Sequence, residues 1–147
     1  MGFFTALESS ASALTAQRLR MDTISENIAN ASTTRTEDGT PYRRKTVIFQ
    51  AANGNTPFSS YLSKASRESF SNGGVRVSAI VQDTTPFKSV YDPGHPDADE
   101  NGMVQMPNVE VVTEMVNMIS ATRAYEANVT AINTTKSMAA KALEIGK

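Results

Sequence analysis

The two ends of the chain carry the longest hydrophobic periodicities in the sequence, and these constrain the fold most strongly. Apolar side chains recur at alternating steps of four and three residues through residues 3–30, and again through residues 108–145. This spacing places them on one face of an α-helix, in the pattern of helical coiled coils. The mean helix of a globular protein has only about 11–12 residues. We therefore predict two unusually long terminal helices.

Capping residues set the expected bounds of the two helices. Asn30 follows the first apolar stripe, and asparagine tolerates the left-handed conformation that closes many helices. Pro107 and Asn108 precede the second stripe, where asparagine is a favoured N-cap. Glu110 suits the positive end of the helix dipole, and Gly146 provides a stop at the other end.

Two long helices at opposite ends of a chain most simply pair antiparallel, joined by a middle that goes out and returns. Because the C-terminal helix is longer, part of its apolar face is expected to contact other chains. On the N-terminal helix, the predicted subunit-packing residues are Leu7, Leu14, Met21, Ile24, Asn27, Ile28 and Asn30. On the C-terminal helix, they are Val111, Met115, Met118, Ile119, Tyr125, Val129, Ile132 and Leu143.

Two of these groups have a second interpretation of equal weight. Methionine fills irregular gaps within a core as readily as it fills variable interfaces, so the helix methionines could pack inside one chain. The segment Asn27–Asn30 could turn its amides toward a neighbour, or could simply be the C-terminus of a helix.

The middle of the chain has the character of a small sheet. Residues 42–50 and 75–82 are rich in β-branched side chains, and 87–91 is a weaker third strand. The polar stretch 51–74 is predicted to be a flexible loop. The fold class is therefore α+β: long N- and C-terminal helices form an antiparallel, coiled-coil-like pair, with a small β-rich middle and mobile loops. We expect one domain from 1–30 with 108–147, and a second segment from 31–107.

The composition argues against catalysis and against binding to nucleic acid. The chain has 147 residues, no cysteine, a single histidine and a net charge of −1. Thiolate chemistry and multi-histidine metal sites are therefore excluded, and phosphate binding lacks the basic excess that it needs. The basic run Arg43-Arg44-Lys45 lies in a strand-like context that would divide its side chains between two faces. We expect no enzyme activity, no cofactor and no bound metal.

One acidic segment has a partial resemblance to a calcium-binding loop. Residues 97–102 (Asp-Ala-Asp-Glu-Asn-Gly) match the first half of an EF-hand loop, but Asn108 stands where the bidentate glutamate should be. A calcium-responsive helical adaptor module therefore remains a rival interpretation of the chain.

Targeting signals are also missing. The first basic residue is Arg18, so no charged region precedes the apolar start, and a cleaved secretory signal is not expected. No apolar stretch approaches the ~18 residues of a membrane-spanning helix. The chain is expected to be cytosolic, or to be exported by a route that reads no cleaved leader.

Two segments resemble the signatures of a known family. Residues 25–36 (Ser-Glu-Asn-Ile-Ala-Asn-Ala-Ser-Thr-Thr-Arg-Thr) resemble the N-terminal signature of the bacterial flagellar axial proteins, which form the rod and hook. Residues 108–128 resemble the C-terminal signature of the same family. The short middle, the 41–45 stretch and the ending 142–147 are most similar to proximal rod members, although a sibling rod or hook subunit remains an alternative.

The resemblance implies a structural role. Members of this family leave the cell through the flagellar type III export apparatus without a cleaved signal. They polymerise helically through their terminal helices into the rod, which spans the periplasm and transmits torque from motor to hook. The expected partners are therefore other copies of this chain, neighbouring rod proteins and the export apparatus.

Overall fold

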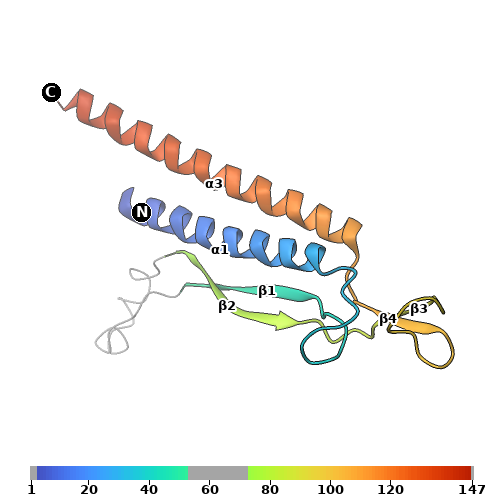
Figure 1. Cartoon of the computed structure of the whole chain (residues 1–147). Coiled ribbons are helices and arrows are strands. Elements are labelled where there is room, and N and C mark those ends of the chain that lie inside the picture. Colours follow the sequence, from blue (N-terminus) through green and yellow to red (C-terminus); the bar gives the residue numbers. More distant parts are fainter. Residues whose placement is uncertain (1–2, 53–72, 147) are drawn as a thin grey trace, which may run out of the picture. The chain divides into compact units, whose positions relative to one another are not determined.

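The computed structural model describes residues 3–52 and 73–146. Along the chain, the elements run α1 (Phe3–Ala29), β1 (Lys45–Ala51), β2 (Val75–Gln82), β3 (Lys88–Tyr91), β4 (Met103–Met106) and α3 (Val111–Ile145) (Figure 1). Two long terminal helices with a small strand-rich middle confirm the predicted α+β class. Almost all of the predicted flexible loop 51–74 lies outside the described residues.

The N-terminal helix ends where the sequence indicates, but by a different device. Helix α1 has 27 residues, and Asn30 follows it directly. The prediction of a left-handed residue there is wrong, because no non-glycine residue of the described segments has a positive φ. Instead, the Asn30 side chain donates to the Glu26 carbonyl oxygen (2.9 Å) and accepts from Thr33. These bonds satisfy the helix end without a left-handed turn.

The C-terminal helix begins later than predicted. Helix α3 has 35 residues and starts at Val111, with its first bond running from Glu114 N to the Glu110 carbonyl oxygen (2.9 Å). The expected N-cap role of Asn108 is therefore wrong. The Asn108 side chain instead accepts from the Arg44 amide (2.8 Å) and donates to Asp83 and Thr85. Asn108 is thus used to hold the middle segment rather than the helix.

Within the described residues, the strands form two separate two-stranded sheets, β1–β2 and β3–β4. The strand predicted at 75–82 matches β2, while β1 begins at Lys45 rather than at residue 42. Strand β3 matches the weaker prediction, and β4 was not predicted. The sequence of β4, Met-Val-Gln-Met, has one β-branched residue, so its strand character depends on its partner.

Strands β3 and β4 run antiparallel, with Lys88 opposite Met106 and Tyr91 opposite Met103. The acidic segment after β3 is therefore the connection of a hairpin. Gly102 closes this connection with a φ of 73°, which favours glycine. An added Cβ at Gly102 would lie 3.0 Å from Tyr91 Cε2, so the position also has no room for a side chain.

The chain divides into two compact units, which are described separately. The first comprises residues 1–18, 49–78 and 122–147, and the second comprises 19–48 and 79–121. In the first unit, the Ser12 hydroxyl accepts from the Val75 amide (3.0 Å), which ties α1 to β2. In the second unit, the last turns of α1 meet the first turns of α3 through side-chain bonds. The predicted division into 1–30 with 108–147 and 31–107 stays a prediction.

Candidate functional site

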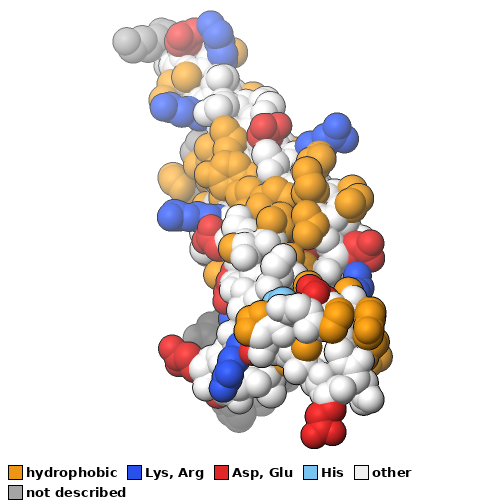
Figure 2. Space-filling view, turned by 45° about the vertical axis from the view of Figure 1, so that its right-hand side comes forward, with side chains coloured by type: hydrophobic (Ala, Val, Ile, Leu, Met, Phe, Trp, Pro, Cys, Tyr) orange, Lys and Arg blue, Asp and Glu red, His pale blue; other side chains and the backbone are white. Residues whose placement is uncertain are grey.

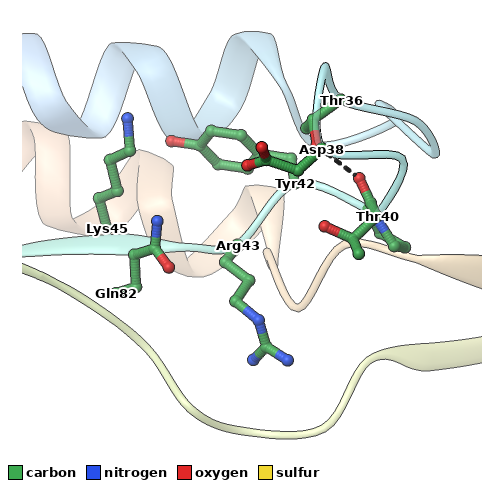
Figure 3. A pocket seen from close by; sticks show the side chains of 8 residues that line it. Thr36, Asp38, Thr40, Tyr42, Arg43, Lys45 and Gln82 are labelled. Carbon is green, nitrogen blue, oxygen red and sulfur yellow. Dashed lines mark hydrogen bonds between the residues drawn. The ribbon is translucent and has the colours of Figure 1, made fainter.

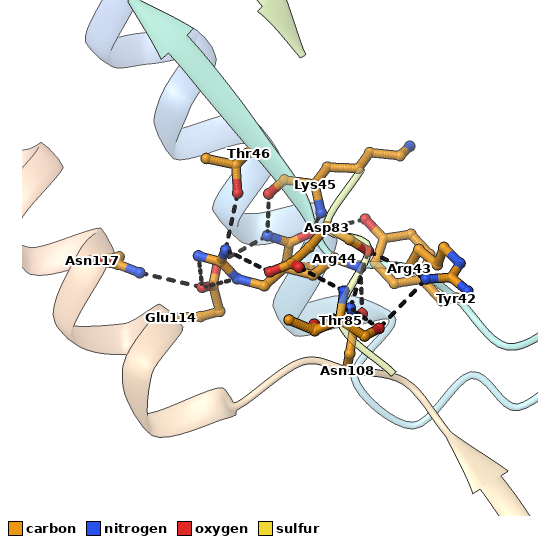
Figure 4. A network of polar contacts seen from close by, with 11 residues as sticks. Tyr42, Arg43, Arg44, Lys45, Thr46, Asp83, Thr85, Asn108, Glu114 and Asn117 are labelled. Carbon is orange, nitrogen blue, oxygen red and sulfur yellow. Dashed lines mark hydrogen bonds and ion pairs between the residues drawn. The ribbon is translucent and has the colours of Figure 1, made fainter. Parts of the chain in front are cut away.

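The second unit contains a buried carboxylate at the start of α3. Glu114 is fully buried and pairs with the Arg44 guanidinium, with Nη2 and Nε at 2.8 and 3.0 Å from Oε1 (Figure 4). Asn117 donates to the same oxygen at 3.2 Å. A buried charge is tolerated when it is paired and hydrogen-bonded in this way. Arg44 also lies 3.6 Å from the Asp83 carboxylate, so one guanidinium links α3 to the segment after β2.

The other oxygen of Glu114 connects to α1 through Asn27, which is also fully buried. The Asn27 amide nitrogen donates to Glu114 Oε2 (2.9 Å) and to the Lys45 carbonyl (2.8 Å). Its oxygen accepts from the Tyr42 hydroxyl (3.0 Å) and from the Lys45 amide (2.9 Å). All four hydrogen-bonding positions of the amide are used. We call Asn27, Tyr42, Arg44 and Glu114 the polar junction; it joins both helices to the start of β1.

The surroundings of Tyr42 and Asp83 shift the pKa values of both side chains. Burial raises the pKa of Tyr42 to about 12, and the negative charges of Glu26 and Glu114 add to the effect. The pKa of Asp83 is lowered from its ordinary value of 3.8, chiefly because the Thr85 backbone amide donates to its carboxylate. The Thr85 hydroxyl and Arg44 lower it further.

The basic run 43–45 divides among different partners, although only Lys45 lies in a strand and the expected strand context of Arg43 and Arg44 is wrong. Arg43 lies over the Phe87 ring, 4.3 Å from the centroid, while Lys45 pairs with Glu26 on α1. A cavity of about 280 Å³ opens beside this run (Figure 3). Its lining is polar and comes from the loop before β1 and the end of β2: Thr36, Asp38, Thr40, Pro41, Tyr42, Arg43, Lys45 and Gln82. With two cations and one carboxylate, it has no arrangement of acid, base and nucleophile that would suggest catalysis.

The predicted packing residues of α1 lie at several depths. Ile24 and Asn27 are buried within the single chain. The remaining ones are half-buried: Leu7, Leu14, Met21, Ile28 and Asn30. The amide of Asn27 is directed into its own chain. The role of this set in packing between subunits stays a prediction.

The predicted residues of α3 are more exposed. Of the predicted set, Val111, Met115 and Ile119 are about half exposed. Their neighbours Val112 and Val116, which were not in that set, are 70% and 61% exposed. Figure 2 shows hydrophobic side chains gathered in patches on the surface of the molecule. We call the five side chains Val111, Val112, Met115, Val116 and Ile119 the α3 apolar face. Further along α3, Met118, Tyr125 and Ile132 are half-buried, and Val129 and Leu143 are exposed.

The first turns of α3 carry no exposed charge between Glu110 and Thr122, since Glu114 faces inward. Exposed apolar patches of this kind mark interaction surfaces on soluble proteins. The α3 apolar face is therefore the best candidate for a functional surface on this part of the chain.

The acidic connection between β3 and β4 uses its carboxylates internally. Asp97 accepts from the Thr34 hydroxyl (2.8 Å), and Asp99 accepts from the Asn101 and Met103 amides (both 3.0 Å). His95 is half-buried and bonds the Asp97 amide through Nδ1. Within residues 3–52 and 73–146, no group of three or more acidic or histidine side chains is arranged to hold a metal ion. Neither long helix has an apolar run sufficient to span a membrane in those segments.

The polar junction was the main feature that sequence reasoning missed. Glu114 interrupts an apolar stripe, and Arg44 lies in a run of three cations, so each is readable as a solvent-facing residue. A carboxylate between apolar positions 111, 112, 115 and 116 is the one signal that could have indicated a buried ion pair.

Comparison with known proteins agrees with this architecture at both ends of the chain. Residues 7–35 match the family model "Flagella basal body rod protein", and residues 100–145 match "Flagellar basal body rod FlgEFG protein C-terminal". These two segments contain most of α1, the whole of α3 and the residues of the junction on both helices. The chain therefore has the form of a flagellar axial protein of the rod class.

Full-length relatives narrow the class further. The flagellar basal-body rod protein FlgC of Bacillus subtilis is 52% identical, with all of both chains covered. FlgC of Borreliella burgdorferi is 51% identical over 99% of this chain and 98% of the relative, and FlgC of Salmonella typhimurium is 42% identical over all of both chains. The chain belongs to the FlgC family of flagellar basal-body rod proteins.

Proposed function

We propose that this chain is a structural subunit of the flagellar basal-body rod, in its proximal part, and that it polymerises helically through its terminal helices. The α3 apolar face is the observation that carries this proposal. Family membership supplies the context, since the relatives of the whole chain are named as rod proteins. In this function the chain transmits torque mechanically, with no chemical step and no nucleic acid.

The size of the apolar face indicates how assembly would be stabilised. Fully burying one Val, Ile or Met side chain contributes about 1.5–3 kcal/mol. The face has five such side chains, each already partly covered, so its burial would contribute roughly 4–8 kcal/mol. Association of two proteins costs an estimated ~4–15 kcal/mol. One such contact is therefore marginal, whereas a subunit that contacts several neighbours in a helical array gains enough to assemble.

The polar junction supports this function from behind the face. Glu114 lies on the same two turns of α3 as Val111, Val112 and Met115, but it points into the chain. Its bonds to Arg44 and Asn27 fix the rotation of the helix, so that the apolar side chains face outward. We infer that the junction orients the assembly surface.

Export and location are parts of the same proposal. We propose that the chain leaves the cell through the flagellar export apparatus with no cleaved signal, and that it resides where the rod crosses the periplasm. The N-terminal peptide recovered from assembled rods should then begin at Met1 or Gly2. A mature N-terminus further along the chain would contradict export without cleavage.

A pair of variants tests the assembly surface. Ile119→Asp puts a charge into the α3 apolar face, and Ser120→Asp puts the same charge at the next, exposed position of the helix. In cells that lack the native copy, we expect Ile119→Asp to abolish incorporation into basal bodies, while Ser120→Asp incorporates. Equal far-UV circular dichroism of both variants would show that folding is retained. Normal incorporation of Ile119→Asp would refute the proposed surface.

A further inference from the structure

Strand β3 has one edge with no neighbouring strand in the described residues. It pairs with β4 alone in the described part of the chain, and all four of its residues are exposed. A two-stranded hairpin is only marginally stable by itself, and an unpaired edge is a template for another strand. Tyr91 and Val90 are 69% and 44% exposed, so the strand also presents apolar side chains.

The register shows which backbone groups point to the open edge. The Asp92 amide donates to the Gly102 carbonyl (2.9 Å), so these two residues form a hydrogen-bonded pair. In an antiparallel ladder such pairs alternate along the strand. Val90 and Lys88 therefore point their backbone N–H and C=O groups toward β4. Ser89 and Tyr91 point theirs away from β4, toward solvent.

A second open edge lies on the same unit, at the end of β2. Residues Ala79–Gln82 are all exposed, and β2 pairs with β1 alone in the described chain. The Asp83 amide donates to the Arg44 carbonyl (2.8 Å), so its N–H points toward the β1 side. By the same alternation, Gln82, which directly precedes Asp83, points its backbone groups away from β1. At the other end of β2, the Ala52 amide donates to the Gly74 carbonyl (2.8 Å), so the alternation shifts by one residue within the strand, and we assign the outward direction to Gln82 alone.

We propose that the open edge of β3 pairs, antiparallel, with the open edge of β2 of a second copy of this chain. With Ser89 opposite Gln82 of that copy, the outward backbone groups of these two residues meet. The same register sets Lys88 of one copy opposite Asp83 of the other, so a positive and a negative side chain meet at the ends of the two strands. Val90 then faces Val81, and Tyr91 faces Ile80. Opposite charges and aromatic or β-branched pairs are the combinations that stabilise neighbouring strands. This inference rests on the proposed function, because it names a second contact of the same assembly.

The same register within one chain would form a hairpin whose turn is residues 84–87. The structure holds that turn in another shape. Asn108 donates to the Asp83 and Thr85 carbonyls (3.2 and 3.3 Å) and to the Thr85 hydroxyl (2.8 Å). Arg43 donates to the same two carbonyls. These bonds separate β2 from β3 within a chain and leave both edges available to other copies.

The contact would join two different surfaces of identical subunits. Each copy offers one β3 edge and one β2 edge, so a pair formed this way still has one of each unpaired. Head-to-tail contacts of this type produce rings, or open helical assemblies where the rotation does not close, rather than two-fold dimers. Strand pairing and burial of the α3 apolar face would thus be two separate contacts of one array.

Cysteine cross-linking tests the pairing directly, because the chain has no cysteine of its own. One differently tagged copy carries Ser89→Cys, and the other carries Gln82→Cys. Opposite residues in a hydrogen-bonded pair have Cα atoms about 5.5 Å apart, which suits a disulfide. At high protein concentration under mild oxidation, we expect the mixed dimer to form about tenfold more than with Thr46→Cys, an exposed position on β1, in place of Gln82→Cys.

The outcomes of this experiment distinguish the strand pairing from its alternatives, and the first three would overturn it. Ser89→Cys homodimers in place of the mixed dimer would mean that β3 pairs with itself. If a single chain that carries both Ser89→Cys and Gln82→Cys forms only an intramolecular disulfide, β2 and β3 pair within one chain. Self-association without the mixed cross-link would refute strand pairing and leave assembly through α3 standing. The mixed cross-link together with normal incorporation of Ile119→Asp would refute the α3 surface alone.

A backbone variant gives an independent readout. Ser89→Pro removes an outward N–H but leaves the ladder with β4 intact, because proline is tolerated on an open edge. Ser89→Ala keeps that N–H and is the control. We expect Ser89→Pro to weaken self-association about tenfold relative to Ser89→Ala in sedimentation. Equal association of the two variants would overturn the proposal.

Discussion

The polar junction makes a quantitative prediction about Asn27. Replacing Asn27 with alanine removes four hydrogen bonds of 2.8–3.0 Å in one step. It leaves a buried oxygen of Glu114 and the buried Tyr42 hydroxyl without these partners. A buried polar group without a partner costs about 1–3 kcal/mol. The half-buried Lys45 backbone can recover part of its bonding from water. We therefore expect Asn27→Ala to lower the free energy of unfolding by roughly 3–5 kcal/mol.

Asn30 provides the matched control, since it is the same residue type next to the end of the same helix. Its amide donates at the surface to the Glu26 carbonyl. Asn30→Ala removes two bonds at the helix end that water can largely replace, and it should therefore cost about 0.5–1 kcal/mol. Urea unfolding followed by far-UV circular dichroism measures both variants. A small domain has roughly 5–15 kcal/mol of stability in total, so the expected loss is easily resolved.

A small effect of Asn27→Ala would contradict the role assigned to the polar junction. If Asn27→Ala cost less than about 1 kcal/mol, or no more than Asn30→Ala, the four bonds would not hold the two helices to β1. The junction could then not orient the α3 apolar face. Tyr42→Phe removes only one of the four bonds and should fall between the two variants, at about 1 kcal/mol.

Three further predictions concern single positions. Tyr42 should titrate near pH 12 in absorbance at 295 nm. Because folding raises its pKa, Tyr42 stabilises the fold below pH 10, and this contribution is lost between about pH 10 and 12. The Tyr42→Phe variant should not show this loss. Gly102→Ala should destabilise the chain by about 1–2 kcal/mol more than Gly39→Ala in urea unfolding. Both glycines have a positive φ, but only at Gly102 would an added Cβ collide with a neighbouring side chain, that of Tyr91, and equal losses would contradict this steric reason. Folding lowers the pKa of Asp83, so its contribution to the free energy of unfolding is present above pH 3.8 and is lost as the pH falls below that value. Asp83→Asn should flatten the dependence of stability on pH over this range, and an unchanged dependence would contradict the assigned hydrogen bonds.

The two long helices were predictable because their signal is local and repeated. A period of 3.5 residues over many turns identifies a helix without knowledge of its partner. The expected α1 segment, 3–30, differs from the observed helix by one residue. The start of α3 was less predictable, because Asn108 is a good cap by composition. Whether an asparagine caps a helix or binds a strand depends on what the fold brings to it, here Arg44, Asp83 and Thr85.

Long-range pairing explains what sequence reasoning could not reach. Strand β4 gains its strand conformation from β3, and Glu114 gains its burial from Arg44, 70 positions away in the sequence. Neither relation leaves a periodic signal in one sequence. Three residues of the α3 apolar face, Val111, Met115 and Ile119, belong to the predicted packing set, and their contact with other chains stays a prediction. The division of this part of α3 into an outward apolar side and an inward Glu114 was visible only in the structure.

The central claim is that this chain is a component of the flagellar rod. Mass spectrometry of basal bodies purified from the source cell tests it most directly. We predict that the chain is present and is retained after washing with detergent and salt, in constant proportion to the other rod proteins. Its absence from intact basal bodies that contain those proteins would contradict the claim.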